Sequence, residues 1–246
     1  MQHAPIILFG LGTGYGLPDK SPFVQKAETQ LKMAGLAYEK RNGSRDEAPK
    51  GKLPYIEDAG TRIGDSTLIR AHLEQRDGFD LDAGLSAPQR AQAWTLERLL
   101  EDHLYWALVY YRWMDLDNFA KGPAHNVDHA PEALRPQLRT DMQARVADTL
   151  RMHGLGRHTP DEILTLGRRS LDTVAAWLDD RDYLFTDHPT ATDATASAIL
   201  AGLLTPFFDS PLRSAAERHA NVVAYVGRMM QRYFPEHAWE VRAHGT

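Results

Sequence analysis

The chain has 246 residues, of which 43% are hydrophobic and 25% charged, and its formal net charge is −5. This length allows one or two domains, and the composition is that of a folded, water-soluble protein, which excludes disordered, collagenous and membrane-spanning classes. A negative chain without a Lys/Arg stripe argues against nucleic acid as a partner. The sequence contains no cysteine, so disulfides, thiolate zinc sites and an enzyme cysteine nucleophile are all excluded.

The first residues predict neither a targeting signal nor a membrane segment. The short apolar run within residues 1–9 has no lysine or arginine before it and ends in glycines, unlike a secretory signal peptide. The most apolar later window, Ala196 to Leu204, is far shorter than the ~18 residues that a spanning helix requires, and Pro206 follows it. We therefore expect a cytoplasmic protein that does not insert into a membrane.

Residues 1–78 alternate strand and helix signals. A first helix begins at Pro22 and ends at Gly35, since proline suits the first turn and glycine the C-terminal end. A second helix begins at Asp65 and reaches about Arg76. Strands are expected at residues 6–9, 38–41, 54–57 and 61–63, with a hairpin turn at 58–60. This order predicts a small α/β domain.

A polar, turn-rich linker over residues 79–87 separates this domain from an all-helical domain over residues 88–246. One apolar stripe continues to Met114 and predicts a helix of about 40 Å, at 1.5 Å per residue. Such a helix is long enough to line the whole interface between the domains. Further helices are expected at residues 133–152, 160–178, 192–204 and 220–233.

Two motifs invite a functional interpretation that the sequence does not support. The glycine-rich loop over residues 10–16 lacks the dinucleotide-binding pattern, because Tyr15 stands where a glycine is required and Pro18 prevents a helix from opening there. His125 and His129 have the spacing of a metal pair on a helix, but the sequence around them is polar and offers no third ligand. We predict a flexible loop and no metal site.

Three other positions leave two roles open. Ser21 precedes Pro22 at a helix start, where its hydroxyl either caps the helix or faces an anion at the positive end of the helix dipole. Asp65 and Ser66 pose the same choice at the second helix. Pro54 enters a strand, either as an ordinary strand edge or as a cis proline.

These positions carry a resemblance to a known family. Lys52-Leu53-Pro54-Tyr55-Ile56 followed by Asp65-Ser66 resembles the glutathione-binding half of the glutathione S-transferase superfamily. Ser21-Pro22-Phe23-Val24, with Leu36-Ala37-Tyr38-Glu39, is similar to its serine-type members. Residues 80–85, 100–106, 112–115 and 153–158 resemble the branch that contains the metaxins and the failed axon connections protein, and residues 190–193 resemble the capping box of the second domain.

The resemblance implies a thioredoxin-like N-terminal domain, an all-helical C-terminal domain, a homodimer, and glutathione as cosubstrate without a metal. It implies that Ser21 donates its hydroxyl to the glutathione sulfur. The resemblance also implies that the backbone of Leu53, before a cis Pro54, binds the cysteinyl part of glutathione. Asp65 and Ser66 would bind the γ-glutamyl ammonium and carboxylate. Lys52 and Lys40 would bind the glycyl carboxylate.

We expect a glutathione transferase that activates the thiol for transfer to a small electrophile, as in detoxification. The electrophile would lie against the long helix, where Tyr105, Trp106, Tyr110 and Trp113 either line the site or form packed core. Two alternatives remain open: a non-catalytic binding or adaptor protein of the metaxin type, which keeps the fold without turnover, and a glutathione-dependent peroxidase or isomerase, which shares every residue named.

Overall fold

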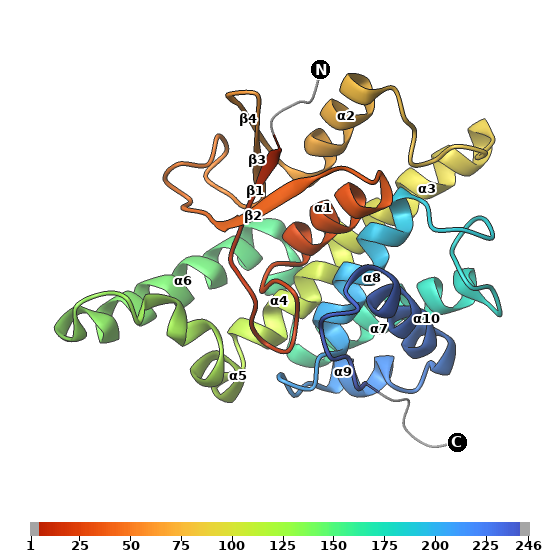
Figure 1. The fold of residues 1–246 in the computed structure, drawn as a ribbon. Coiled ribbons are helices and arrows are strands. Elements are labelled where there is room, and N and C mark those ends of the chain that lie inside the picture. The colour runs from red at the N-terminus through yellow and green to blue at the C-terminus, as the bar shows by residue number, and fades with distance from the viewer. Residues whose placement is uncertain (1–4, 242–246) are drawn as a thin grey trace.

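The computed structural model describes residues 5–241 and consists of a small α/β part followed by a helical part (Figure 1). Residues 1–4, where the segment interpreted as lacking a targeting signal begins, and residues 242–246, the end of the second predicted domain, lie outside the described residues. This is the α/β plus all-α architecture that the sequence predicts. Within residues 5–241, the helices are too short or too polar to cross a bilayer.

The α/β part is built on a mixed sheet of four strands. Its strands are β1 (Ile6–Gly10), β2 (Tyr38–Asn42), β3 (Tyr55–Asp58) and β4 (Thr61–Gly64), in the spatial order β2-β1-β3-β4. Strand β1 pairs parallel with β2 and antiparallel with β3, and β3 pairs antiparallel with β4. All four predicted strands are therefore confirmed, within one residue at each end.

Helices α1 (Pro22–Met33) and α2 (Ser66–Asp77) cover the sheet. Their apolar faces join the strands in one core, made of Ile6, Leu8, Val24, Ala27, Leu31, Ile56, Ile69 and Leu73. Helix α2 is capped at its C-terminus by Gly78, whose φ of +70° lies in the left-handed region that favours glycine. Helix α1 also contacts α8 (Ala191–Leu204), so it lies between the sheet and the helical part (Figure 1).

The helical part begins with the long helix that the apolar stripe predicts. It consists of α3 (Ala87–Leu99), a π-helical turn (Leu100–Leu104) and α4 (Tyr105–Trp113). The π-helical turn is a departure from the regular helix that the stripe predicts, and such turns occur often at functional sites. The later helices are α5 (Leu116–Lys121), α6 (Arg135–His153), α7 (Pro160–Leu178), α9 (Pro211–Ala216) and α10 (Ala220–Tyr233).

Helices α5 and α9 have no counterpart in the sequence prediction. Each has six residues, which is too short for an apolar period to be visible. Both depend on their caps: the Asp115 carboxylate accepts from the Asn118 amide at 2.9 Å, and the Ser210 hydroxyl accepts from the Arg213 amide at 3.0 Å. Local capping and tertiary contact, rather than a periodic pattern, make these helices.

Helix α8 is the centre of the helical part, because every one of its residues is buried. Its predicted capping box is confirmed. The fully buried Asp193 carboxylate accepts hydrogen bonds from the Thr190 amide at 2.8 Å and the Thr190 hydroxyl at 2.9 Å. It also accepts from the Leu184 amide and the Tyr225 hydroxyl, both at 3.0 Å. These donors allow a polar group to start a helix inside the core.

Candidate functional site

Ser21 occupies the N-cap position of α1, but its side chain does not cap the helix. The fully buried Asp19 organises this turn instead, since its carboxylate accepts from the amides of Leu11, Gly12 and Ser21 at 3.3, 3.0 and 3.0 Å. The Ser21 hydroxyl makes no hydrogen bond to any described residue. It is therefore available to a ligand at the N-terminus of α1.

Lys40 supports this turn from β2. Its ammonium lies 2.7 Å from Glu28, 3.3 Å from the Asp19 carboxylate and 3.0 Å from the carbonyl oxygen of Pro18. Burial raises the pKa of Asp19 above its ordinary value, and the Lys40 charge acts in the opposite direction. Lys40 is thus engaged within the protein and would have to leave these partners to reach a ligand.

The Leu53–Pro54 bond is cis, as the resemblance implies. The backbone N–H and C=O of Leu53 make no hydrogen bond to described residues. The Pro54 carbonyl accepts from the Asp65 amide at 3.2 Å. This bond fixes the unpaired Leu53 backbone next to the start of α2.

The sequence left open whether Asp65 and Ser66 cap α2 or face a ligand, and the structure gives the two residues different surroundings. Asp65 caps α2, because its Oδ1 accepts from the amides of Thr67 and Leu68 at 2.9 and 3.2 Å. Its φ of +85° is strained for a residue with a side chain, and such strain concentrates at functional sites. Ser66 is only 4% exposed, and its hydroxyl has no hydrogen-bond partner among the described residues. Lys52 is exposed and unpaired on the neighbouring loop.

The sequence analysis missed Lys26, which lies at the seam between the two parts. Its ammonium is 1% exposed and lies 2.6 Å from Glu101, 3.6 Å from Glu97 and 3.1 Å from the Thr67 hydroxyl. Burial raises the pKa of Glu97, while Lys26 and Arg70 lower it. The available signal was a lysine one turn after Pro22, on a helix buried on both sides.

The four aromatic candidates all lie on α4 and divide into two pairs. Tyr105 packs edge-on against Phe23, two residues after Ser21, with ring centroids 4.8 Å apart. Trp106 follows at 5.5 Å from Tyr105 and stacks on His153 at 4.7 Å. The structure thus brings Tyr105 to the first turn of α1, whereas Trp106 lies between Tyr105 and His153 of α6.

Tyr110 and Trp113 instead contact aromatic neighbours within the helical part. Tyr110 packs edge-on against Tyr111 at 5.3 Å, and Trp113 lies 6.1 Å from Phe119 of α5. No ring contact joins either of them to the α/β part among residues 5–241. These contacts do not decide whether the two side chains pack or line a site, and both stay candidates for the electrophile site.

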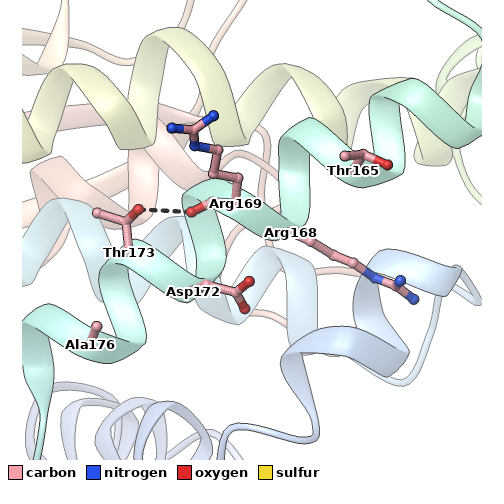
Figure 2. A pocket seen from close by; sticks show the side chains of 6 residues that line it. All are labelled: Thr165, Arg168, Arg169, Asp172, Thr173 and Ala176. Atoms are coloured by element: carbon pink, nitrogen blue, oxygen red, sulfur yellow. Dashed lines mark hydrogen bonds between the residues drawn. The ribbon is translucent and has the colours of Figure 1, made fainter.

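The remaining candidates do not form a site. Within residues 5–241, no three histidine, cysteine or acidic side chains gather as metal ligands. His125 pairs with Asp128 at 2.7 Å on an exposed turn. A hollow of about 530 Å³ on α7 is an open surface groove, and Figure 2 shows Arg168 and Arg169 leaving the helix in different directions rather than converging on a ligand.

Comparisons with known proteins agree with this geometry. The glutathione S-transferase N-terminal domain family matches residues 22–118, and the glutathione S-transferase C-terminal domain family matches residues 167–229. An isoprene-epoxide–glutathione S-transferase of Rhodococcus sp. is 31% identical over 241 residues, covering 93% of this chain and 99% of that protein.

Other relatives carry different names. Failed axon connections of Drosophila melanogaster is 34% identical over 233 residues, which are 89% of this chain and 56% of that protein. Human metaxin-1 is 27% identical over 249 residues, 97% of this chain and 53% of that protein. The chain therefore spans about half the length of these two relatives.

The fold is also that of a solved enzyme. A glutathione S-transferase from Methylobacterium radiotolerans, in complex with glutathione sulfonate, matches with a TM-score of 0.59 at 20% identity. The match covers 99% of this chain and 97% of that chain. The thioredoxin-like domain with a helical C-terminal domain, predicted from the sequence, is confirmed.

The Lys26 cluster predicts a pH-dependent loss of stability. Lys26→Met removes one of the two cations near each buried carboxylate and leaves Arg98 at 2.7 Å from Glu101 and Arg70 at 3.8 Å from Glu97. Unfolding should become easier at neutral pH, by less than the cost of a fully uncompensated buried charge, which is about 3–5 kcal/mol. Without Lys26 the pKa of Glu97 rises further, and a carboxyl group with a raised pKa favours the folded state only while protonated. The loss in the free energy of unfolding caused by Lys26→Met should therefore become smaller as the pH falls to about 4 and larger above that pH.

Urea unfolding across this pH range tests the prediction. Lys50→Met is the matched control, because Lys50 is exposed and forms no ion pair with described residues. A Lys26→Met deficit that is equal at pH 4 and pH 7 would contradict the prediction.

Proposed function

Because the chain belongs to the glutathione S-transferase family, we propose that it is a serine-type glutathione transferase that acts on a small electrophile. The observation that carries this proposal is the set of unsatisfied polar groups at two helix N-termini and one strand end. Ser21, Ser66 and the Leu53 backbone each lack a partner among the described residues. We also propose the cytoplasm as its compartment, since glutathione keeps thiols reduced there.

Glutathione has the groups that these positions require. Its γ-glutamyl carboxylate suits the Ser66 hydroxyl at the N-terminus of α2, and its ammonium suits the free oxygen of the Asp65 carboxylate. Its cysteinyl amide groups suit the Leu53 backbone as an added strand. Lys52 is the free cation for the glycyl carboxylate, whereas Lys40 is already held by Glu28 and Asp19.

The proposed chemistry begins with ionisation of the thiol next to Ser21. Lowering a thiol pKa from ~8.5 by about two requires roughly 2.7 kcal/mol. A hydrogen bond from the Ser21 hydroxyl to the thiolate contributes about 1.5–3 kcal/mol, and the α1 dipole contributes up to about 2 kcal/mol. These two sources together are sufficient. The thiolate then forms a carbon–sulfur bond to the electrophile as the bond from that carbon to its leaving group breaks, and the leaving group keeps the electron pair of the broken bond.

The electrophile is proposed to lie between the domains, against Tyr105 and Trp106. The relative named for isoprene epoxide makes an epoxide the first electrophile to test. Tyr110 and Trp113, on the same helix α4, are the other two residues proposed to contact the electrophile.

A non-catalytic binding protein is the second candidate function. The relatives named failed axon connections and metaxin-1 favour it, because a shared fold does not guarantee turnover. Such a protein would keep the fold whether or not it binds glutathione, so ligand binding and thiol ionisation must be measured separately.

Ser21→Ala should reduce conjugation of glutathione by about 10- to 150-fold, the kinetic equivalent of one hydrogen bond to a charged acceptor. Turnover with an epoxide and the urea midpoint are measured together. Ser86→Ala is the control, because it removes a capping-box serine of α3 and should cost ~1 kcal/mol of stability without affecting turnover. Full activity in Ser21→Ala would refute the serine mechanism.

Glutathione should raise the melting temperature of the protein. At 100 times its dissociation constant, a ligand of the native state adds ~2.7 kcal/mol, which corresponds to about 5–10 °C for a chain of this size. S-methylglutathione should give a similar shift but no thiolate absorbance. Ser66→Ala should weaken the binding of both ligands, because the variant lacks the hydroxyl that contacts the γ-glutamyl carboxylate.

The pattern of shifts separates the two candidate functions. A shift without thiolate absorbance in glutathione would indicate a binding protein. No shift with either ligand at millimolar concentration would leave Leu53 and Ser66 without the proposed ligand, and the adaptor function would replace the enzyme.

We further propose a homodimer that uses the exposed apolar surface of α2 and α3. Leu68 on α2 is 48% exposed and Trp94 on α3 is 53% exposed. Arg70 and Glu97, 3.8 Å apart, join these two helices. Exposed large apolar side chains on two adjoining helices are what a second copy of the chain could cover, together with the Arg98 guanidinium that lies 4.4 Å from the Trp94 ring centroid.

Sedimentation analysis tests the dimer. A double variant, Leu68→Glu with Trp94→Glu, should dissociate it, while Leu116→Glu on α5, where Leu116 is 72% exposed, should not. A dimer that survives the double variant would show that this surface is not the interface.

A further inference from the structure

Arg112 of α4 is a buried cation without a buried anion. Its side chain is 7% exposed, and its guanidinium donates to two main-chain carbonyls, those of Lys20 at 3.3 Å and Gly202 at 3.0 Å. No carboxylate among the described residues pairs with it. The other buried cation at the seam, Lys26, has a carboxylate oxygen at 2.6 Å. An unpaired buried charge is costly, so this arrangement requires an explanation.

The groups that face Arg112 reduce this cost without neutralising the charge. Its guanidinium carbon lies 5.5 Å from the Tyr15 ring centroid and 4.7 Å from that of Phe208, both within cation–π range. Tyr15 and Tyr105 are the titratable groups that face it, and burial raises the pKa of both phenols, so neither carries a charge at neutral pH. Burial lowers the pKa of Arg112 to about 10, which leaves it protonated.

This charge lies at the N-terminus of α1. The Lys20 carbonyl that accepts from Arg112 is bonded to the nitrogen of Ser21, which places the guanidinium within about 6 Å of that nitrogen. Gly202 of α8, whose carbonyl accepts from Arg112 at 3.0 Å, packs closely against the first residue of α1, because a Cβ there would lie 3.3 Å from the Pro22 ring. The negative charge of Asp19, at the same turn, is already matched by Lys40 at 3.3 Å.

We propose that Arg112 is a positioning residue that holds the turn before Ser21 and supplies the fixed positive charge that favours the glutathione thiolate over the thiol. The inference rests on the proposed function and adds a residue of the helical domain to it. Ionisation breaks the S–H bond, leaves the electron pair on sulfur and releases the proton to solvent. The bound thiolate is then the anion that the buried guanidinium lacks in the free protein.

The test is the apparent pKa of the bound thiol, measured from thiolate absorbance as a function of pH in the 246-residue chain. Arg112→Gln and Arg112→Met should raise this pKa by about 1–2, as expected for a charge at this range in a medium of intermediate dielectric. Arg112→Lys keeps the charge and should stay within about 0.5 of the parent. Affinity for S-methylglutathione, which has no ionisable thiol, should change less than about threefold.

Arg181→Gln is the matched control, because Arg181 also donates to main-chain carbonyls, those of Leu178 at 3.3 Å and Leu184 at 2.9 Å, at a different part of the helical domain. It should leave the thiol pKa unchanged. A neutral Arg112 variant that folds, binds S-methylglutathione and keeps the parent thiol pKa would overturn the proposal.

Two further outcomes remain distinct. If neither neutral variant folds, the Arg112→Lys variant tests the proposal. Because this variant keeps the positive charge, a bound-thiol pKa near the free value of ~8.5 would contradict the proposed role of Arg112. If the parent protein itself binds glutathione without thiolate, the proposed transferase fails, and the inference about Arg112 fails with it for that separate reason.

Discussion

The burial of α1 on two sides is the constraint on which the rest of the structure depends. Nine of its 12 residues are buried, because the helix covers the sheet with one face and contacts α8 with another. Polar side chains of α1 therefore lose water whichever way they point. A buried charge on this helix needs a partner in the helical part or in the sheet, and such partners join the two parts into one unit. The buried amide of Gln30, by contrast, has no hydrogen bond to described residues.

The buried charges at this seam follow that rule with one exception. Lys26 faces Glu101 and Glu97 from the helical part, and Glu28 faces Lys40 from β2. Arg112 has only carbonyls and aromatic rings. A fold selected for stability alone gains nothing from such a charge, because an apolar side chain of similar volume is often as stable. Because Arg112 lies next to the turn that carries Ser21, we attribute its buried charge to the proposed binding of the glutathione thiolate.

The same seam explains how one fold serves relatives with different names. Packing of α1 against the sheet and α8 requires apolar and paired polar residues, and it is independent of what occupies the N-termini of α1 and α2. The free hydroxyls of Ser21 and Ser66 and the unpaired Leu53 backbone are additional to that packing. They have no partner among the described residues, and the proposed transferase function assigns them to glutathione.

The sequence by itself determined the elements whose signals are local or periodic. The four strands, the start of α1 at Pro22, the Thr190–Asp193 capping box and the long apolar stripe all follow from spacing and turn chemistry. The motif around Pro54 and Ser66 also indicated the family through residues close in sequence.

Only the tertiary structure decided which partner each polar group has. It showed that Asp19, not the Ser21 hydroxyl, organises the turn before α1, and that Lys40 is held by Glu28. It also brought Lys26 to Glu101, which is 75 residues away along the chain. It placed Arg112 on the carbonyl of Lys20, 92 residues away, without a carboxylate partner among the described residues. Local patterns cannot supply such pairings, because the energy of a buried charge depends on groups that meet only when the two domains pack together.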